Sequence, residues 1–233
     1  MMPLLDLWLQ LSLPEKVSTP FLSHPESPPL IISQGYTVVR GSGQVKQEAR
    51  SVSSFRGIRL TGIGQVSVRQ TGQESLSVEA EDNILPLLQT KVVNEILILD
   101  VRNNTTIQPT APIRYDIEVK QLDQLQLSGA GSMEVLDLST PALSVSISGT
   151  GELTLAGEAE ELEVGVSGTG ELEAQNLITQ RAEVNSRGVG EAIIHTQEDL
   201  KVNISGVGSV RYLGTPRIQQ SISGLGTIRP YRP

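Results

Sequence analysis

Apolar and polar residues alternate in short runs along the second half of the chain. Across 143–155, every second residue is apolar or glycine, and the two glycines belong to a Ser-Gly-Thr-Gly step in the middle. The same register returns in 162–174 and 200–212. Alternation with a period of two predicts β-strands that bury one face. Each repeat is therefore expected to contain two short strands on either side of a glycine pair.

The glycine pairs themselves recur at a nearly constant spacing. Successive Gly-x-Gly steps in the second half of the chain are 20, 19, 20, 18 and 18 residues apart. The predicted turn glycines are Gly129, Gly131, Gly149, Gly151, Gly168, Gly170, Gly188, Gly190, Gly206, Gly208, Gly224 and Gly226. Because they occur at positions where a side chain would otherwise point inward, we expect a sharp bend that has no room for a Cβ or requires a positive φ.

These repeats predict an all-β fold, a right-handed parallel β-solenoid (β-helix) with about 18–20 residues per coil. Stacked coils pair their backbones at a spacing of about 4.8 Å, and parallel crossovers are overwhelmingly right-handed. Ile147, Val166, Ile204 and Ile222 should then form one aliphatic column. An antiparallel sandwich is the competing fold, but its turns recur every 8–12 residues or so, which is shorter than the period here.

Proline content and the period of the hydrophobic pattern divide the chain into two regions. Residues 1–34 are rich in proline, show no sustained period, and are predicted to be a poorly ordered leader, with at most a degenerate signal region. Residues 35–233 are predicted to form the solenoid domain. Within it, 35–122 should contain irregular coils or a cap, and 123–233 the regular coils.

The irregular region still contains strand-like runs. These are Leu76–Ala80, Glu95–Val101 and Ile113–Val119, and Asp82 is predicted to cap a short helical turn. At the other end, the tail 228–233 places prolines and arginines where the last strand edge would lie. Such residues discourage end-to-end pairing of strands.

Composition excludes several functions. The formal net charge is −8 and aromatic residues make up only 3% of the chain, which argues against nucleic-acid binding. Cysteine is absent, so disulfides, thiolate metal sites and cysteine nucleophiles are excluded. No run of the sequence reaches the roughly 18 apolar residues of a transmembrane helix. We predict no metal and no cofactor.

Outward positions beside the glycines form the candidate site. Glu152, Glu171 and Glu191 follow the second glycine in three successive repeats and form a candidate acidic ladder. Two interpretations stay open: a cation-binding row, or a solvated acidic face. The serines that precede the first glycine are expected to form a polar ladder, because neither His24 nor His195 recurs beside them as a base.

The middle residues of the turns become apolar toward the C-terminus. Val189, Val207 and Leu225 occupy this position in the last three pairs. Such a stripe suits a partner or self-association patch, or a surface tucked beneath a connecting segment.

Three segments together resemble a known family. The runs 41–45, 55–64 and 75–86, followed by serial Ser-Gly-x-Gly turns, resemble the bacterial putative auto-transporter adhesin, head GIN domain family over about 36–229. The resemblance implies an extracytoplasmic β-helical protein of the cell envelope, or a secreted one, with an adhesion role and no catalytic residues. Family members usually carry an export signal, and this sequence shows no clear signal peptide.

We therefore predict a non-enzymatic, adhesin-like binding or structural module. Its expected partner is a surface polysaccharide or a protein. The alternatives are a polysaccharide-active β-helix enzyme, a lyase or hydrolase, and a self-assembling scaffold. An enzyme would need clustered acidic and basic groups with exposed aromatics for sugar stacking, and its aspartates should follow the repeat. Here the aspartates are dispersed relative to the glycine period.

Overall fold

The computed structural model describes residues 32–33 and 36–232. The predicted leader, 1–34, lies outside these residues except for Ile32–Ser33, which form a short strand against the following one. No helix among the described residues has the length and apolar character needed to span a membrane.

Strands account for nearly all of the regular structure. In chain order, the elements are β1 (Ile32–Ser33), β2 (Tyr36–Arg40), β3 (Val45–Arg50), β4 (Gly57–Leu60), β5 (Ile63–Gln70), β6 (Ser75–Glu81), the 3₁₀ turn η1 (Leu85–Leu87), β7 (Leu88–Val93), β8 (Ile96–Val101), β9 (Thr105–Gln108), β10 (Arg114–Val119), β11 (Gln124–Leu127), β12 (Ala130–Ile147), β13 (Thr150–Val166), β14 (Thr169–Ser186), β15 (Val189–Ile204), β16 (Val207–Leu213), β17 (Arg217–Ile222) and β18 (Leu225–Pro230).

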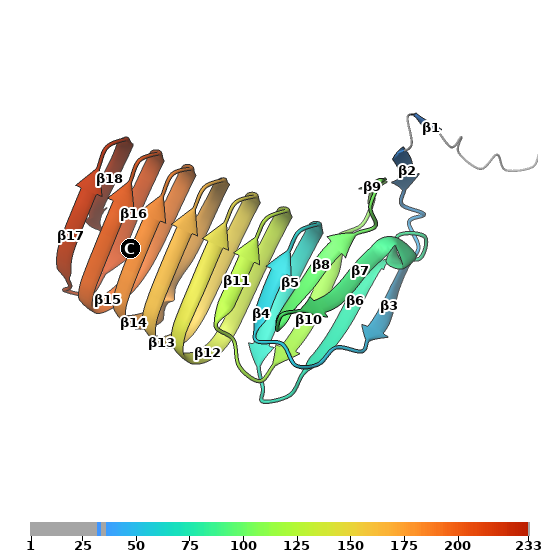
Figure 1. Ribbon diagram of the computed structural model, residues 1–233, viewed down its shortest axis with the longest axis horizontal. Helices are drawn as coiled ribbons and strands as arrows, with labels where there is room; N and C mark the ends of the chain where they lie inside the picture. The colour runs from blue at the N-terminus through green and yellow to red at the C-terminus, as the bar shows by residue number, and fades with distance from the viewer. Residues whose placement is uncertain (1–31, 34–35, 233) are drawn as a thin grey trace, which may run out of the picture.

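From β11 onward the chain winds into stacked parallel coils (Figure 1). Each Gly-x-Gly corner separates two strand segments, one for each main sheet of the stack. Gly131 lies opposite Gly151 and Val145 lies opposite Val164, so equivalent residues of neighbouring coils are in register. The predicted parallel β-solenoid, with one glycine pair in each regular coil, is confirmed.

The first coils are not stacked in chain order. β4 pairs in parallel with both β8 and β11, and β5 pairs in parallel with both β10 and β12. The coil made by β4 and β5 therefore lies between a coil that comes later in the chain and the first regular coil. Beyond β8 and β10, the antiparallel strands β7, β6 and β3 cover the N-terminal end of the parallel stack.

The strand-like runs predicted in this region are confirmed as β6, β8 and β10. The predicted capping role of Asp82 is wrong. The 3₁₀ turn follows Ile84 and has no side-chain cap, while the Asp82 carboxylate accepts a hydrogen bond from Ser42 Oγ at 2.6 Å. The Ser42 hydroxyl and the Lys46 ammonium group, 3.4 Å from Asp82 Oδ2, interact with this carboxylate instead.

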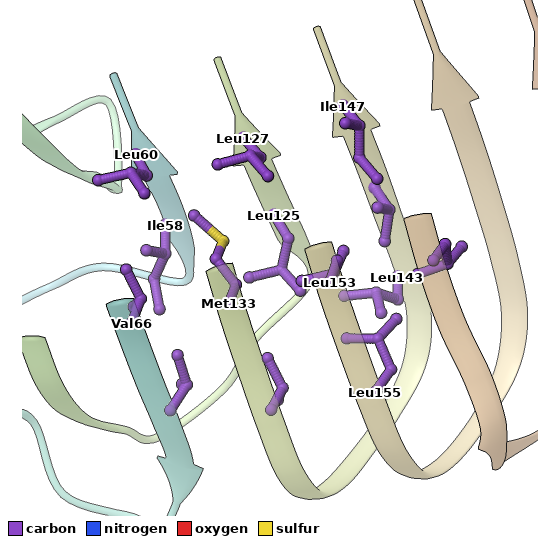
Figure 2. Close-up of a cluster of buried hydrophobic side chains, with 14 of the residues drawn as sticks. Ile58, Leu60, Val66, Leu125, Leu127, Met133, Leu143, Ile147, Leu153 and Leu155 are labelled. Atoms are coloured by element: carbon purple, nitrogen blue, oxygen red, sulfur yellow. The ribbon is translucent and has the colours of Figure 1, made fainter. Parts of the chain in front are cut away.

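Aliphatic columns fill the interior (Figure 2). Leu60, Leu127 and Ile147 lie in register in three neighbouring coils, and Val66, Met133 and Leu153 form a second column across from them. Each buried member of such a column contributes roughly 1.5–3 kcal/mol to stability. The predicted column of Ile147, Val166, Ile204 and Ile222 is present, with Ser186 between its second and third members.

The corner glycines are needed because neighbouring coils touch through their backbones. A Cβ on Gly149 would lie 1.9 Å from the carbonyl oxygen of Gly129 in the preceding coil. The second glycine of the same pair, Gly151, has φ +158°, and its Cβ would lie 1.8 Å from the Gly131 carbonyl oxygen. At Gly170 the nearest atom would instead be Ile147 Cγ2, at 2.8 Å. The missing side chains therefore allow the coils to stack at the corner.

Candidate functional site

A groove of about 680 Å³ follows the glycine corner along the solenoid. We call it the glycine groove. Its floor is formed by the second glycine of successive pairs, and its two rims by the residues on either side of that glycine. The lining residues that define it are Ile63, Gly64, Gln65, Gly131, Ser132, Thr150, Gly151, Glu152, Thr169, Gly170, Glu171, Val189, Gly190 and Glu191, with a wall from residues 109–113.

The acidic ladder lies along one rim of this groove. Glu152, Glu171 and Glu191 face one another in register in three successive coils. Glu191 accepts a hydrogen bond from Ser209 Oγ at 3.1 Å and pairs with Arg211. Among the described residues, no group of three acidic, histidine or cysteine side chains is arranged to hold a metal ion.

The opposite rim consists of the middle residues of the turns. Thr150 and Thr169 line its polar part, and Val189 continues the row. Val189, Val207 and Leu225 are 52%, 48% and 80% exposed, so no connecting segment within the described residues covers this stripe. The rim thus changes from hydroxyl-bearing to apolar toward the C-terminus.

A buried carboxylate holds the wall at the N-terminal end of the groove. Glu81, at the end of β6, is only 1% exposed. It accepts hydrogen bonds from Gly43 N at 2.7 Å, from Thr110 N at 2.9 Å and from the Thr110 hydroxyl. A Cβ on Gly41 would overlap the same carboxylate. Glu81 therefore ties the 41–44 turn to the loop that closes the groove.

These hydrogen bonds decide the ionisation of Glu81. Burial by itself would raise the pKa of this carboxyl group, but the bonds from Thr110, Gly43 and Ala111 together lower the pKa below its ordinary value of 4.5. The charged form is therefore the one that the fold stabilises. Nothing in the spacing of the sequence singled this residue out, because its partners come from two distant loops.

Glu81→Gln is expected to lower the free energy of unfolding by about 2 kcal/mol at pH 7, because its amide cannot accept all of these bonds. A folded-state pKa below the unfolded value gives stability that is present above about pH 4.5 and lost as pH falls through the folded pKa. Denaturant titrations at pH 7 and at pH 3 measure both values. The gap between wild type and variant should shrink at pH 3. An unchanged gap would mean that the charge of Glu81 does not stabilise the fold.

A second groove, of about 850 Å³, runs along the side of the coil where the strands of the other sheet begin. We call it the charged groove, because its outer row is a ladder of alternating charge. Arg181 Nη2 lies 2.7 Å from Glu161 Oε1, and Arg217 Nη2 lies 2.8 Å from Asp199 Oδ2. These residues follow the glycine period, so a search for charges that recur at the glycine spacing would have found them. Because the charges neutralise one another, the glycine groove is the better candidate for a ligand site.

The corner serines show no catalytic arrangement with histidine in the described part of the chain. His195 Nδ1 lies 3.2 Å from the Gln175 carbonyl oxygen, and its Nε2 lies 3.1 Å from Gln197 Nε2. His24 lies outside the described residues. The serines, which are all exposed on the outside of the corner, are Ser128, Ser148, Ser167, Ser205 and Ser223.

Stacked coils with a grooved corner define this protein as a β-solenoid repeat domain. The family model for the putative auto-transporter adhesin, head GIN domain, matches residues 54–216. The chain therefore belongs to that family, and the resemblance predicted from the sequence is confirmed. No curated protein matches the chain.

Solved structures share the fold. A putative adhesin from Bacteroides fragilis NCTC 9343 is 24% identical, with a TM-score of 0.68 over 83% of this chain and 100% of that one. A putative lipid binding protein from Parabacteroides distasonis ATCC 8503 is 20% identical, with a TM-score of 0.52 over 84% of this chain and 100% of that one. At these identities the likeness establishes the architecture.

Proposed function

We propose that this protein is a non-enzymatic, adhesin-like module of the cell envelope or surface, and that the glycine groove holds an extended polymer. The partner is a surface polysaccharide or an extended protein segment. The observation that carries the proposal is the continuity of the groove, which has the same glycine floor in successive coils and a row of in-register carboxylates along one rim. Membership of an adhesin family supports a surface role.

The repeat of the groove suits a linear partner. Neighbouring coils are spaced by about 4.8 Å, so hydroxyls on one rim and carboxylates on the other recur at that interval. A polymer with a short repeat can then make the same contact several times. Weak individual contacts add up under these conditions, because each new contact forms at high effective concentration.

The carboxylate geometry favours binding over hydrolysis. Glycosidases place two carboxyl groups on opposite sides of the scissile bond, and the acid has a raised pKa. Glu152, Glu171 and Glu191 all lie in one row, on one rim of the groove. Glu152 and Glu171 are exposed to solvent, whereas the catalytic acid of such an enzyme lies in an apolar pocket.

Filling the groove tests its role. Thr150→Arg with Thr169→Arg puts two long side chains on the rim, and both positions are exposed, so the fold should tolerate them. Affinity electrophoresis through gels that contain linear polysaccharides, and pull-down of fragments from the native envelope, measure binding. We expect at least a tenfold loss of affinity for the polymer that the wild-type protein binds.

The control is Ser144→Arg with Glu163→Arg, which puts two arginine side chains on neighbouring coils of the charged groove. This variant should bind like the wild type. An equal loss of affinity in both variants would contradict the proposed role of the glycine groove. Release of new reducing ends or unsaturated sugars from the bound polysaccharide would favour the enzyme instead.

The surface role is tested separately. Intact native cells treated with protease should lose the protein while cytosolic markers survive. Recovery of the full-length chain in the cytosol would contradict an adhesin-like role.

A further inference from the structure

Among the described residues, no strand covers the C-terminal end of the solenoid. In the described part of the chain, β17 pairs only with β15, and β18 pairs only with β16 (Figure 1). One edge of each strand is therefore unpaired. The core columns also end in solvent here, since Ile218 and Ile222 are 39% and 41% exposed while their counterparts in the preceding coil are buried.

Hydrogen-bond directions show which backbone groups face this open edge. Ser223 N donates to the Ile204 carbonyl, so the alternate residues Ile218, Gln220 and Ile222 direct their backbone groups away from β15. In β18, Leu225 N donates to the Gly206 carbonyl. By the same alternation, Gly226, Ile228 and Pro230 direct their backbone groups outward.

We propose that a second copy of this chain covers the open end, related by a two-fold axis perpendicular to the solenoid axis. The axis passes beside Gln220 in β17 and beside Ile228 in β18. Each strand then pairs antiparallel with its own copy, and inward-facing residues stay inward. Ile218 lies opposite Ile222 of the second copy, and the open aliphatic columns close on one another.

The chemistry at the axis favours an identical partner. Gln220 takes the place in its column that Val202 has in the preceding coil. Its side-chain amide carries both donors and an acceptor, so two copies of Gln220 can bond to each other across the axis. In β18, the bulky Pro230 lies opposite Gly226 of the second copy, which has no side chain.

The charged residues and the size of the final coil are compatible with this two-fold contact. Arg217 is already paired with Asp199, and Arg229 lies opposite Thr227 of the second copy rather than opposite its own counterpart. Residues 217–232 of each copy form the contact. Standard interfaces use about 20–30 residues and about 800 Å² from each partner, so the final coil approaches the lower end of that range.

Symmetry separates the dimer from an open-ended filament. Pro230 has no amide hydrogen, so the outward edge of β18 lacks one donor for any added strand, whether a further coil or the second copy. A two-fold seam closes after two copies, whereas head-to-tail stacking continues without limit. The predicted role of the tail in blocking end-to-end growth is compatible with a dimer.

Mass measurements test the dimer. Light scattering after size exclusion should give twice the mass of the chain, which is 25.1 kDa. Gln220→Lys should be monomeric, because it brings two like charges together at the axis. Gln219→Lys, on the outer face of the same strand, should remain dimeric. Mixing Gln220→Lys with Gln220→Glu should restore the dimer, since only a two-fold contact brings residue 220 against itself.

Cysteine cross-linking tests the same contact at residue level. The chain has no cysteine, so Gln220→Cys introduces a single thiol per copy. Opposed residues in an antiparallel pair have Cα atoms about 5.5 Å apart, within the range for a disulfide. Gln220→Cys should therefore oxidise to a covalent dimer much faster than Gln219→Cys.

A wild-type protein that keeps the mass of a single chain at the highest concentration tested would overturn the dimer, and so would a mass that keeps rising with concentration. Equal cross-linking of the two cysteine variants would overturn the axis through Gln220. None of these results depends on polymer binding in the glycine groove, so the two proposals fail separately.

Discussion

Val164→Asp is expected to abolish folding at 25 °C. Val164 has no solvent-exposed surface and lies in register between Val145 and Val184 in the middle of an aliphatic column. A carboxylate at this position has no partner, and the cost of burying it is about 4 kcal/mol or more, comparable with the whole stability of many domains. Circular dichroism and denaturant titration of the purified variant measure the loss.

The control for this prediction is Glu171→Lys. This side chain points outward on the glycine groove and is exposed, so a reversal of charge should change the free energy of unfolding by less than about 0.5 kcal/mol. Near-equal stability of Val164→Asp and Glu171→Lys would contradict the assignment of inward and outward faces.

Gly149→Ala is expected to be the second most damaging change. The added methyl carbon would lie 1.9 Å from the Gly129 carbonyl oxygen, which belongs to the backbone of the neighbouring coil, so relief requires moving a whole coil. We expect a loss of about 3 kcal/mol in the free energy of unfolding, measured by thermal or chemical denaturation.

Gly165→Ala provides a matched control in the next coil. The added methyl carbon would come no nearer than 3.9 Å to another atom, the Val145 carbonyl oxygen, and the backbone conformation is open to other residues. This variant should be neutral or slightly more stable, since alanine restricts the unfolded chain. If it is as damaging as Gly149→Ala, close contact between coils is not what selects glycine at the corners.

The regular coils could be predicted from the sequence because every coil must bury alternate side chains and turn at a glycine pair. A period-two pattern around each glycine pair fixes both which side chains are buried and where the chain turns, as Val145, Gly149 and Leu153 illustrate. The acidic ladder follows from the same period. Its place on a groove rim does not, because the hollow depends on how closely the corner backbones stack.

Other features depend on contacts that no period encodes. Glu81 binds amides from two loops far apart in the chain, and only the folded structure brings them together. The position of β4 between β8 and β11 is also invisible in the sequence, where Gly62 and Gly129 are separated by a long stretch without a glycine pair. The charged groove was accessible in principle, since its residues keep the glycine spacing.

The placement of β4 and β5 ties the two parts of the chain together. Cleavage of the chain after residue 122, where the regular glycine repeats are predicted to begin, would separate β4 from β11 and β5 from β12. Each fragment would then expose a full edge of both sheets, with Leu60 and Leu127 losing their contact across the cut. The boundary visible in the sequence therefore lies inside one continuous stack of paired strands, and the coil of β4 and β5 supplies the N-terminal neighbour of the first regular coil.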